Sequence, residues 1–219
     1  SICFVKNRNN LIKKIDSEIV SYVETEIIPL YDAFDSGHGR SHVHAVIVDS
    51  LQIAEAVGAN LNMAYVVAAY HDTGMVEGRE FHHLASGKIV EKDANLKRWF
   101  SVDEITLIKE AVEDHRASGK SEPRSIYGKI VADGDRQLDP QTVMIRCLQF
   151  GLKNYPELDK SDHYERFRAH LLDKYARNGY IKLWIPTGDK AQQLNLLHEI
   201  IDDEEKLQRC FEEIWENAK

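Results

Sequence analysis

Eight consecutive apolar or aromatic residues, Met63 to Tyr70, run directly into the dipeptide His71-Asp72. A helix built from these eight residues has no polar side to face water, so we expect it to be buried. A buried chain that ends in an imidazole and a carboxylate must satisfy both groups, because an unpaired buried charge is costly. A metal ion satisfies them well but needs further protein ligands, and the sequence offers His42 upstream and Asp135 downstream.

The size and charge of the chain narrow the class of protein. Its 219 residues suit one large domain or, as the less favoured alternative, two small ones. The net charge of −8 argues against general nucleic-acid binding, which usually needs a basic face. A small phosphorylated substrate stays compatible with this charge, because a bound metal can outweigh it locally.

The cysteines and the apolar runs predict the compartment. Cys3, Cys147 and Cys210 are odd in number and far apart, which indicates free thiols in a reducing compartment. No apolar run reaches the length of a membrane span, and the N-terminus lacks a signal-peptide core. We therefore expect a cytoplasmic protein without a membrane partner.

Helical periodicity runs through almost the whole chain. Only Ile181–Ile185 resembles a strand, and Pro186 ends it. Ser41 is expected to cap a helix, Ser101 and Glu104 have the spacing of a capping box, and Asp139 precedes a proline suited to a first helical turn. Besides the buried helix, the spacing predicts helices over about 12–27, 42–57, 82–93, 101–115, 140–154, 161–176 and 189–217. The short apolar stretch 126–132 leads to Asp133 and Asp135. The expected fold is all-α, a single-domain helical bundle.

His42, His71, Asp72 and Asp135 form a mixed nitrogen and oxygen ligand set. Such a set suits Mn, Fe, Co, Ni, Zn or Mg and argues against a thiolate-rich structural zinc site. His71 and Asp72 are expected at the C-terminal end of a helix. This end is the negative end of the helix dipole and favours a nearby cation. An ordinary buried histidine–carboxylate pair is the structural alternative. Seven of the ten histidines lie between residues 38 and 115, and this clustering favours the metal site.

Four segments carry a resemblance to a known family: Phe34–Val43, Ala69–Gly74, Glu113–Arg116 and Ile130–Arg136. In this order they resemble the HD-domain superfamily of metal-dependent phosphohydrolases, whose H…HD…D ligands sit on an all-helical fold. The resemblance implies an HD core at about 34–139 and a C-terminal helical extension at about 140–219. The C-terminal third carries no motif that indicates a chemistry, and its aromatic residues Tyr175, Tyr180 and Trp184 are expected to pack rather than to close over a site.

The resemblance also implies roles for single residues. The metal ligands map onto His42, His71, Asp72 and Asp135; Asp135 is preferred to Asp133 because the last aspartate of the family usually precedes Arg or Lys. The sequence departs from the family at Gly134, where alanine is usual, and at Thr73, where Ile or Val is commoner. The expected catalytic residues are Asp72 and His115, and the expected substrate-binding residues are His38, His82, His83, Arg116 and Arg136.

Alternatives remain for several of these residues. His82 and His83 are neighbours on a helix, so usually only one of them can face a given site. Arg136 could instead pair with Asp133 or Asp139. His83 and His115, with Asp72 as a bridge, could hold a second ion, although one firmly bound divalent ion is the expected cofactor.

The leading functional hypothesis is hydrolysis of a phosphomonoester, a phosphodiester or a nucleotide by a metal-activated water. The expected partner is a small phosphorylated molecule such as a nucleotide, and the oligomeric state stays open. An HD-type di-iron oxygenase and a non-catalytic regulatory or nucleotide-binding HD module are the alternatives. Other hydrolytic chemistries lack support, because the sequence has no HExxH, no GxSxG and no GxxxxGK[ST] motif. Cys147 lies in an apolar helical segment, which argues against a catalytic thiol.

Overall fold

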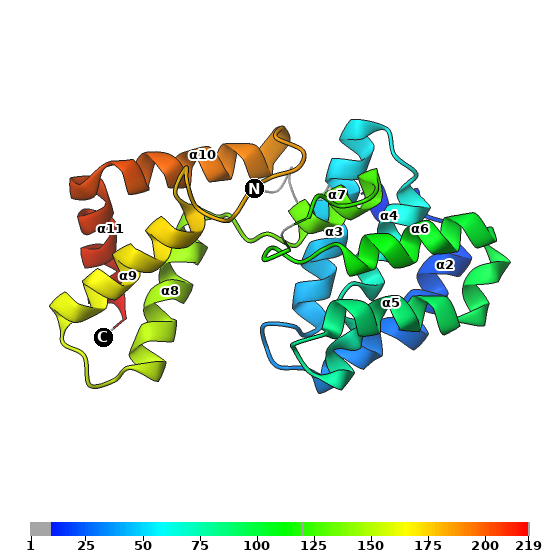
Figure 1. Cartoon of the computed structure of the whole chain (residues 1–219), viewed down its shortest axis with the longest axis horizontal. Helices are drawn as coiled ribbons and strands as arrows, with labels where there is room; N and C mark the ends of the chain where they lie inside the picture. The colour runs from blue at the N-terminus through cyan, green and yellow to red at the C-terminus, as the bar shows by residue number, and fades with distance from the viewer. Residues whose placement is uncertain (1–9, 120, 219) are drawn as a thin grey trace. The chain divides into compact units, whose positions relative to one another are not determined.

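The computed structural model of the chain describes residues 10–119 and 121–218 (Figure 1). These residues form helices and loops, and no strand occurs among them, which confirms the predicted all-α class. Within the same ranges, no helix is both long and apolar enough to cross a bilayer. Cys3 and the N-terminal residues that bear on a signal peptide lie outside the described residues.

The chain divides into two compact units, one ending at Arg136 and one beginning at Gln137. This boundary lies close to the predicted end of the HD core at about residue 139. That the core and the extension form one domain stays a prediction. The described elements of the first unit are α2 (Ser17–Tyr22), the π-helical turn η1 (Val23–Ile27), the 3₁₀ turn η2 (Ile28–Ala33), α3 (Arg40–Val57), α4 (Leu61–Tyr70), the 3₁₀ turn η3 (Thr73–Glu77), α5 (His82–Lys92), the 3₁₀ turn η4 (Ala94–Arg98), α6 (Val102–Glu113) and α7 (Ile126–Gly134). Those of the second unit are α8 (Pro140–Asn154), α9 (Lys160–Tyr175), α10 (Gly188–Asp202) and α11 (Glu204–Asn217).

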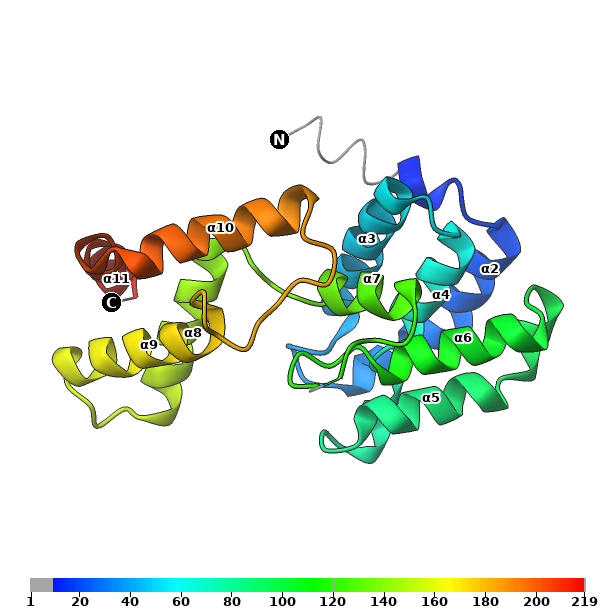
Figure 2. The same ribbon diagram turned by 45° about the horizontal axis from the view of Figure 1, so that its top comes forward.

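Helix α4 is the centre of the first unit. Every residue from Met63 to Tyr70 is buried, as the absence of a polar face predicts. The side chain of Asn60 accepts a hydrogen bond from the backbone N–H of Met63 at 3.1 Å and so caps the helix. Helices α3, α6 and α7 pack against α4, while α5 and α6 lie side by side (Figures 1 and 2). The chain therefore leaves α4 at His71 in the middle of this helical group.

Three of the predicted helix ends are confirmed by their capping bonds. The hydroxyl of Ser101 accepts from the N–H of Glu104 at 3.2 Å, and the Glu104 carboxylate accepts from the N–H of Ser101 at 3.0 Å. Asp139 caps α8 through the N–H of Thr142 at 2.9 Å. Gly58 ends α3 in the left-handed conformation, with a φ of 71°.

Two predicted helices are each interrupted by an aspartate. The expected helix over 12–27 breaks at Asp16, whose side chain accepts from the N–H of Glu18 and starts α2 there. The expected helix over 189–217 breaks at Asp203, which caps α11 through the N–H of Lys206. In both places the aspartate side chain offers the backbone an alternative to the helical bond, which apolar spacing does not register.

One further local prediction is wrong, and one segment that resembles a strand in the sequence is not one. Ser41 does not cap a helix, because α3 already begins at Arg40 after the extended residue Gly39. Residues 181–185 form no strand; the N–H of Ile181 bonds the carbonyl of Lys174 instead. A strand needs a partner edge, and the described part of the chain contains none for this segment.

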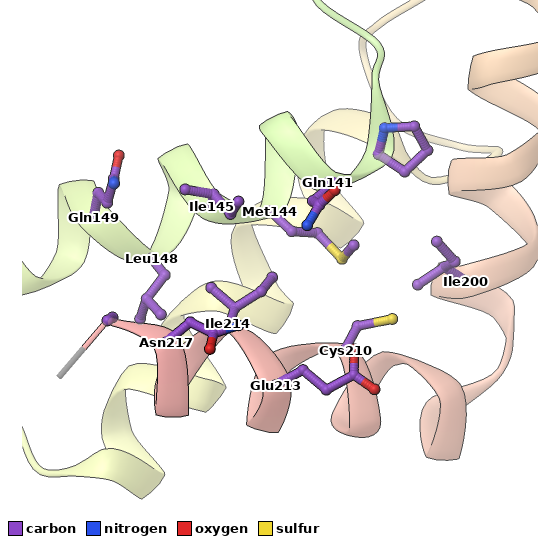
Figure 3. A pocket seen from close by; sticks show the side chains of 12 residues that line it. Gln141, Met144, Ile145, Leu148, Gln149, Ile200, Cys210, Glu213, Ile214 and Asn217 are labelled. Atoms are coloured by element: carbon purple, nitrogen blue, oxygen red, sulfur yellow. The ribbon is translucent and has the colours of Figure 1, made fainter.

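The second unit has its own apolar core. Phe167 and Phe211 pack at 5.2 Å between ring centroids, and Phe211 stacks on Trp215 at 5.7 Å. Tyr175 is buried, as expected of a packing residue, whereas Tyr180 is exposed. Helices α8, α10 and α11 line an open pocket of about 500 Å³, whose walls are mostly aliphatic and include the Cys210 side chain (Figure 3).

Helices α3 and α7 approach each other closely at Gly134. A methyl group added at Gly134 would lie 2.3 Å from the Ser50 hydroxyl oxygen and 3.1 Å from its backbone nitrogen. This contact explains the glycine where the resembled family usually has alanine. It also places the end of α7, and Asp135 after it, directly against α3.

We expect Gly134→Ala to lower the free energy of unfolding by about 1–3 kcal/mol, because overpacking forces α3 and α7 apart. Urea unfolding followed by circular dichroism measures the change. Adding Ser50→Ala, which removes the nearest atom, should restore part of the loss. An unchanged unfolding midpoint in the single variant would contradict this account of the contact.

Candidate metal centre

The four predicted metal ligands come from the ends of three helices, α3, α4 and α7, and meet at the end of α4. His42 lies in the first turn of α3, His71 follows the last residue of α4, and Asp135 follows the last residue of α7. Asp72, the residue after His71, is buried. Each of these side chains lies at a helix end, so small changes in chain direction can bring all of them to one point.

His42, His71, Asp72 and Asp135 form what we call the first ligand group. The Nε2 atoms of His42 and His71 are 3.3 Å apart. Oδ2 of Asp72 lies 3.5 Å from Nε2 of His42 and 3.2 Å from Nε2 of His71. Oδ1 of Asp135 lies 3.1 Å from the first of these nitrogens and 3.5 Å from the second. The structure therefore brings the four predicted ligands together.

Asp72 also belongs to a second ligand group, with His82 and His115. Its other oxygen, Oδ1, lies 3.2 Å from Nε2 of His82 and 3.4 Å from Nε2 of His115. These two nitrogens are 3.3 Å apart. The carboxylate of Asp72 therefore offers one oxygen to each group.

The spacing of the polar atoms fits ligands that share an ion. Two ligands each about 2.1 Å from one ion, at tetrahedral or octahedral angles, are separated by roughly 3.0–3.4 Å. The separations within the two groups, 3.1–3.5 Å, are close to this range. In each group, three potential ligand atoms lie within 4.8 Å of one another, which is close enough for them to bind one ion.

The tautomers of three histidines also fit a metal. Nδ1 of His71 lies 2.7 Å from the carbonyl of Ala68, and His82 and His115 each make the same bond to the carbonyl three residues earlier, at 2.8 and 2.6 Å. A carbonyl only accepts, so Nδ1 carries the proton in each ring. Nε2 of the neutral ring then presents a lone pair to the ligand group.

The electrostatics of the centre are dominated by Asp72 and Asp135. Burial would raise the pKa of Asp72, but the His71 charge and the hydrogen bonds from His115, His42 and His71 hold it well below its usual value. Burial likewise opposes ionisation of Asp135, and hydrogen bonds from His42 and His71 lower its pKa overall. In the absence of an ion, protons on the histidines balance these two carboxylates.

The histidine pKa values shift in the opposite direction. Burial lowers the pKa of His42, and hydrogen bonds to Asp135 and Asp72 outweigh this and raise it. Burial also opposes protonation of His71, yet the charge of Asp72 and bonds to both carboxylates raise its pKa well above the ordinary value. The hydrogen bond to Asp72 raises the pKa of His82.

Asp135 and Asp133 differ in their burial and in the residues that they face. Asp135 is partly exposed and faces the two first-group histidines, whereas Asp133 is fully buried within α7. The geometry therefore favours Asp135, the residue that the resemblance selects.

The second group corrects the prediction for the adjacent histidines. His82, not His83, joins His115 and Asp72, because the first residue of α5 faces the centre and the next one turns away from it. His83 instead lies beside Arg116, with its Nδ1 3.5 Å from the guanidinium. Arg116 also donates to the carbonyl of Glu80 at 3.1 Å.

Two other predicted substrate-binding residues have different surroundings. His38 is partly exposed, bonds Asp35 at 2.9 Å and has its ring 6.0 Å from that of His42, so it lies at the edge of the first group. Arg136 is buried and donates to the backbone carbonyls of His115 and Ala132. These bonds place the guanidinium behind His115, and the expected contact of Arg136 with substrate stays a prediction.

One residue that contacts the centre has no signal in the sequence. The buried Tyr31 of η2 donates to the carbonyl of Ala69 at 2.7 Å and accepts from the N–H of Asp72 at 3.2 Å. Its ring completes an apolar stripe, so the pattern alone indicates only a core residue. Only the three-dimensional structure shows that the Tyr31 hydroxyl bonds the backbone of Asp72.

An all-helical fold with a histidine–aspartate ligand cluster at its helix ends defines the class of HD-domain proteins. The sequence model of the HD domain matches residues 39–137, so this part of the chain forms an HD domain. Both ligand groups lie within the matched residues.

A solved structure shares the fold. It is described as a predicted HD superfamily hydrolase from an uncultured Thermotogales bacterium, with 20% sequence identity and a TM-score of 0.51. The similarity covers 74% of this chain and 88% of that chain. No curated protein matches the sequence significantly.

We expect the metal-free chain to lose stability as the pH rises above 6.5. His42, His71 and His82 have pKa values above that ordinary value in the folded state, so the folded chain holds more protons than the unfolded chain there. Their contribution is complete below pH 6.5 and disappears as the pH passes their raised pKa values.

The two buried carboxylates affect the stability of the chain at acid pH. The lowered pKa values of Asp72 and Asp135 contribute stability above pH 3.8 that is lost on further acidification. Thermal unfolding in chelator between about pH 2 and pH 9 measures both the acid and the alkaline loss of stability. Stability that rises steadily from neutral to alkaline pH would contradict the raised histidine pKa values.

Proposed function

We propose that the protein is a metal-dependent phosphohydrolase that cleaves a small phosphoester, with nucleotides as the leading substrate class. The observation that carries this proposal is the division of the Asp72 carboxylate between two ligand groups, one oxygen to each. Two adjacent ion positions suit the displacement of a phosphoester, in which the attacking and the leaving oxygens both need stabilisation. The HD-domain match supports hydrolysis as the reaction class.

The donor set fits divalent ions, with imidazole nitrogens and carboxylate oxygens and no thiolate. A divalent ion bound there supplies a Lewis acid and lowers the pKa of a bound water. Asp72 would hold both positions with one oxygen each, and we also assign to it the orientation of the attacking water. His115 is buried with Nε2 directed at Asp72, so we assign it to holding an ion rather than to free proton transfer.

Two residues, His38 and Arg116, each lie beside one of the two ligand groups and are the proposed contacts for phosphate. His38 lies beside the first group, and Arg116 lies beside His83, next to the second group. Burial lowers the pKa of His83, and the Arg116 guanidinium, which supplies positive charge at this side, lowers it further. A phosphate oxygen would be attracted there although the chain as a whole carries a net charge of −8.

The partner in this proposal is a small phosphorylated molecule rather than a nucleic acid or a membrane. Cys147 and Cys210 are free thiols, which supports the proposal that the protein works in a reducing compartment such as the cytoplasm.

We expect His71→Ala and Asp72→Ala to abolish bound metal and phosphatase activity together. Elemental analysis of the purified variants, and a panel of phosphoesters assayed with Mn, Co, Ni and Mg, measure both losses. His44→Ala is the matched control, because His44 lies on the same helix as His42 but is only partly buried and pairs with Glu24 at 3.1 Å instead of a ligand. Unchanged metal content in both ligand variants would refute the ligand assignment.

The second ligand group keeps one alternative open, an HD-type di-iron oxygenase. That chemistry requires the second position, which His82 and His115 provide. Iron in the purified protein together with substrate-dependent oxygen uptake, and no phosphate release, would favour the oxygenase over the hydrolase.

We expect Arg116→Ala to raise the KM for a phosphoester about 10- to 150-fold with a smaller change in kcat, as for loss of one charge-assisted bond of roughly 1.5–3 kcal/mol in uniform binding. Steady-state kinetics with the best substrate of the panel measures KM and kcat separately. Arg98→Ala is the control, because Arg98 is an exposed arginine that lies over the Trp99 ring. Equal KM values in the wild type and Arg116→Ala would remove Arg116 from the substrate site.

A further inference from the structure

Three buried polar side chains outside the ligand set each bond the backbone of one ligand of the second group. Tyr31 accepts from the N–H of Asp72 at 3.2 Å. The hydroxyl of Ser86 donates to the carbonyl of His82 at 2.7 Å. The guanidinium of Arg136 donates to the carbonyl of His115 at 3.3 Å. Every ligand of the second group is therefore held from behind by a different side chain.

Each of the three side chains makes a further bond that ties the ligand to a neighbouring segment. Tyr31 donates to the carbonyl of Ala69 in α4, and Arg136 donates to the carbonyl of Ala132 in α7. Ser86 accepts from the N–H of Gly74 at 2.7 Å. Tyr31 and Ser86 have no exposed surface, and Arg136 is 7% exposed.

The Ser86 bonds connect the two halves of the second group directly. Gly74 lies two residues after Asp72, and Ser86 lies one helical turn after His82. The segments touch so closely that a methyl group at Gly74 would lie 2.1 Å from the His82 carbonyl oxygen and 2.4 Å from the Ser86 nitrogen. The hydroxyl therefore fixes the distance between the turn that carries Asp72 and the turn that carries His82.

We propose that Tyr31, Ser86 and Arg136 form a positioning frame, and that Ser86 and Arg136 set the affinity of the second metal position independently of the first. This inference rests on the proposed function, in which the two ligand groups hold ions. Ser86 and Arg136 bond ligands that belong to the second group alone, whereas Tyr31 bonds Asp72, which both groups share.

The physical reason is the geometric tolerance of a metal site. Ligand distances must be correct within about 0.2 Å, so a small movement of one turn weakens a position that has only three protein ligands. Removing residues that orient ligands typically lowers metal affinity by about 10–100-fold. The first group keeps His42, His71 and Asp135 in addition to Asp72, so loss of Ser86 leaves its other ligands in place.

The test compares Ser86→Ala, Arg136→Met and Tyr31→Phe with the wild type. Each full-length protein is stripped of metal and titrated with Mn²⁺ by calorimetry, and electron paramagnetic resonance distinguishes a spin-coupled ion pair from single ions. Thr73→Val is the matched control, because the Thr73 hydroxyl is equally buried and bonds the carbonyl of Tyr70 but contacts no ligand.

We expect two Mn²⁺ ions and a coupled spectrum in the wild type and in Thr73→Val. Ser86→Ala and Arg136→Met should bind the first ion within about threefold of the wild-type affinity and the second about 10–100-fold more weakly, with the coupled signal lost. Tyr31→Phe should weaken both ions. Circular dichroism checks the fold, and Ser86→Ala, the smaller change, decides the outcome if Arg136→Met is unfolded.

Two coupled ions of unchanged affinity in Ser86→Ala would overturn the inference. Equal weakening of both ions in Ser86→Ala, or the same weakening in Thr73→Val, would overturn it as well, since either result indicates general loosening. A wild type that binds a single ion would also overturn it, while the proposed phosphatase activity would still be judged by the His71→Ala experiment.

Discussion

The structure of the first unit depends on one buried carboxylate. Asp72 is 3% exposed, and four histidine nitrogens lie 3.2–3.5 Å from its two oxygens. Burying a carboxylate is unfavourable unless positive charge and hydrogen bonds replace its hydration. Helices α3, α4 and α5 and the end of α6 must therefore meet at this point, and the packing of the unit follows from that requirement.

Close backbone contacts make this convergence possible. Gly74 allows the turn after Asp72 to rest on the first turn of α5, and Gly134 allows α7 to lie against Ser50 of α3. A side chain at either glycine would separate the helices that carry the ligands. The histidine rings are fixed locally instead, since His71, His82 and His115 each bond a carbonyl three residues earlier. Long-range contact thus sets the positions of the helices, and short-range bonds set the ring orientations.

Local sequence signals predicted the elements that local forces determine. The apolar run before His71, the capping box at Ser101 and the Asp139 cap all appear in the structure. The breaks at Asp16 and Asp203 escaped prediction because apolar periodicity continues through them. The resemblance indicated the first ligand group, but the choice between His82 and His83 depends on how α5 is rotated against Asp72. Only tertiary packing decides that rotation, and the same holds for the hydroxyls of Tyr31 and Ser86.

The boundary between the units has an evolutionary consequence. Both ligand groups, the positioning frame and the proposed phosphate contacts all come from residues that precede Gln137. Selection on the metal chemistry therefore acts on one contiguous stretch of the gene. The segment that encodes α8 to α11 is free to diverge, or to be exchanged for another, without altering a single residue of the centre.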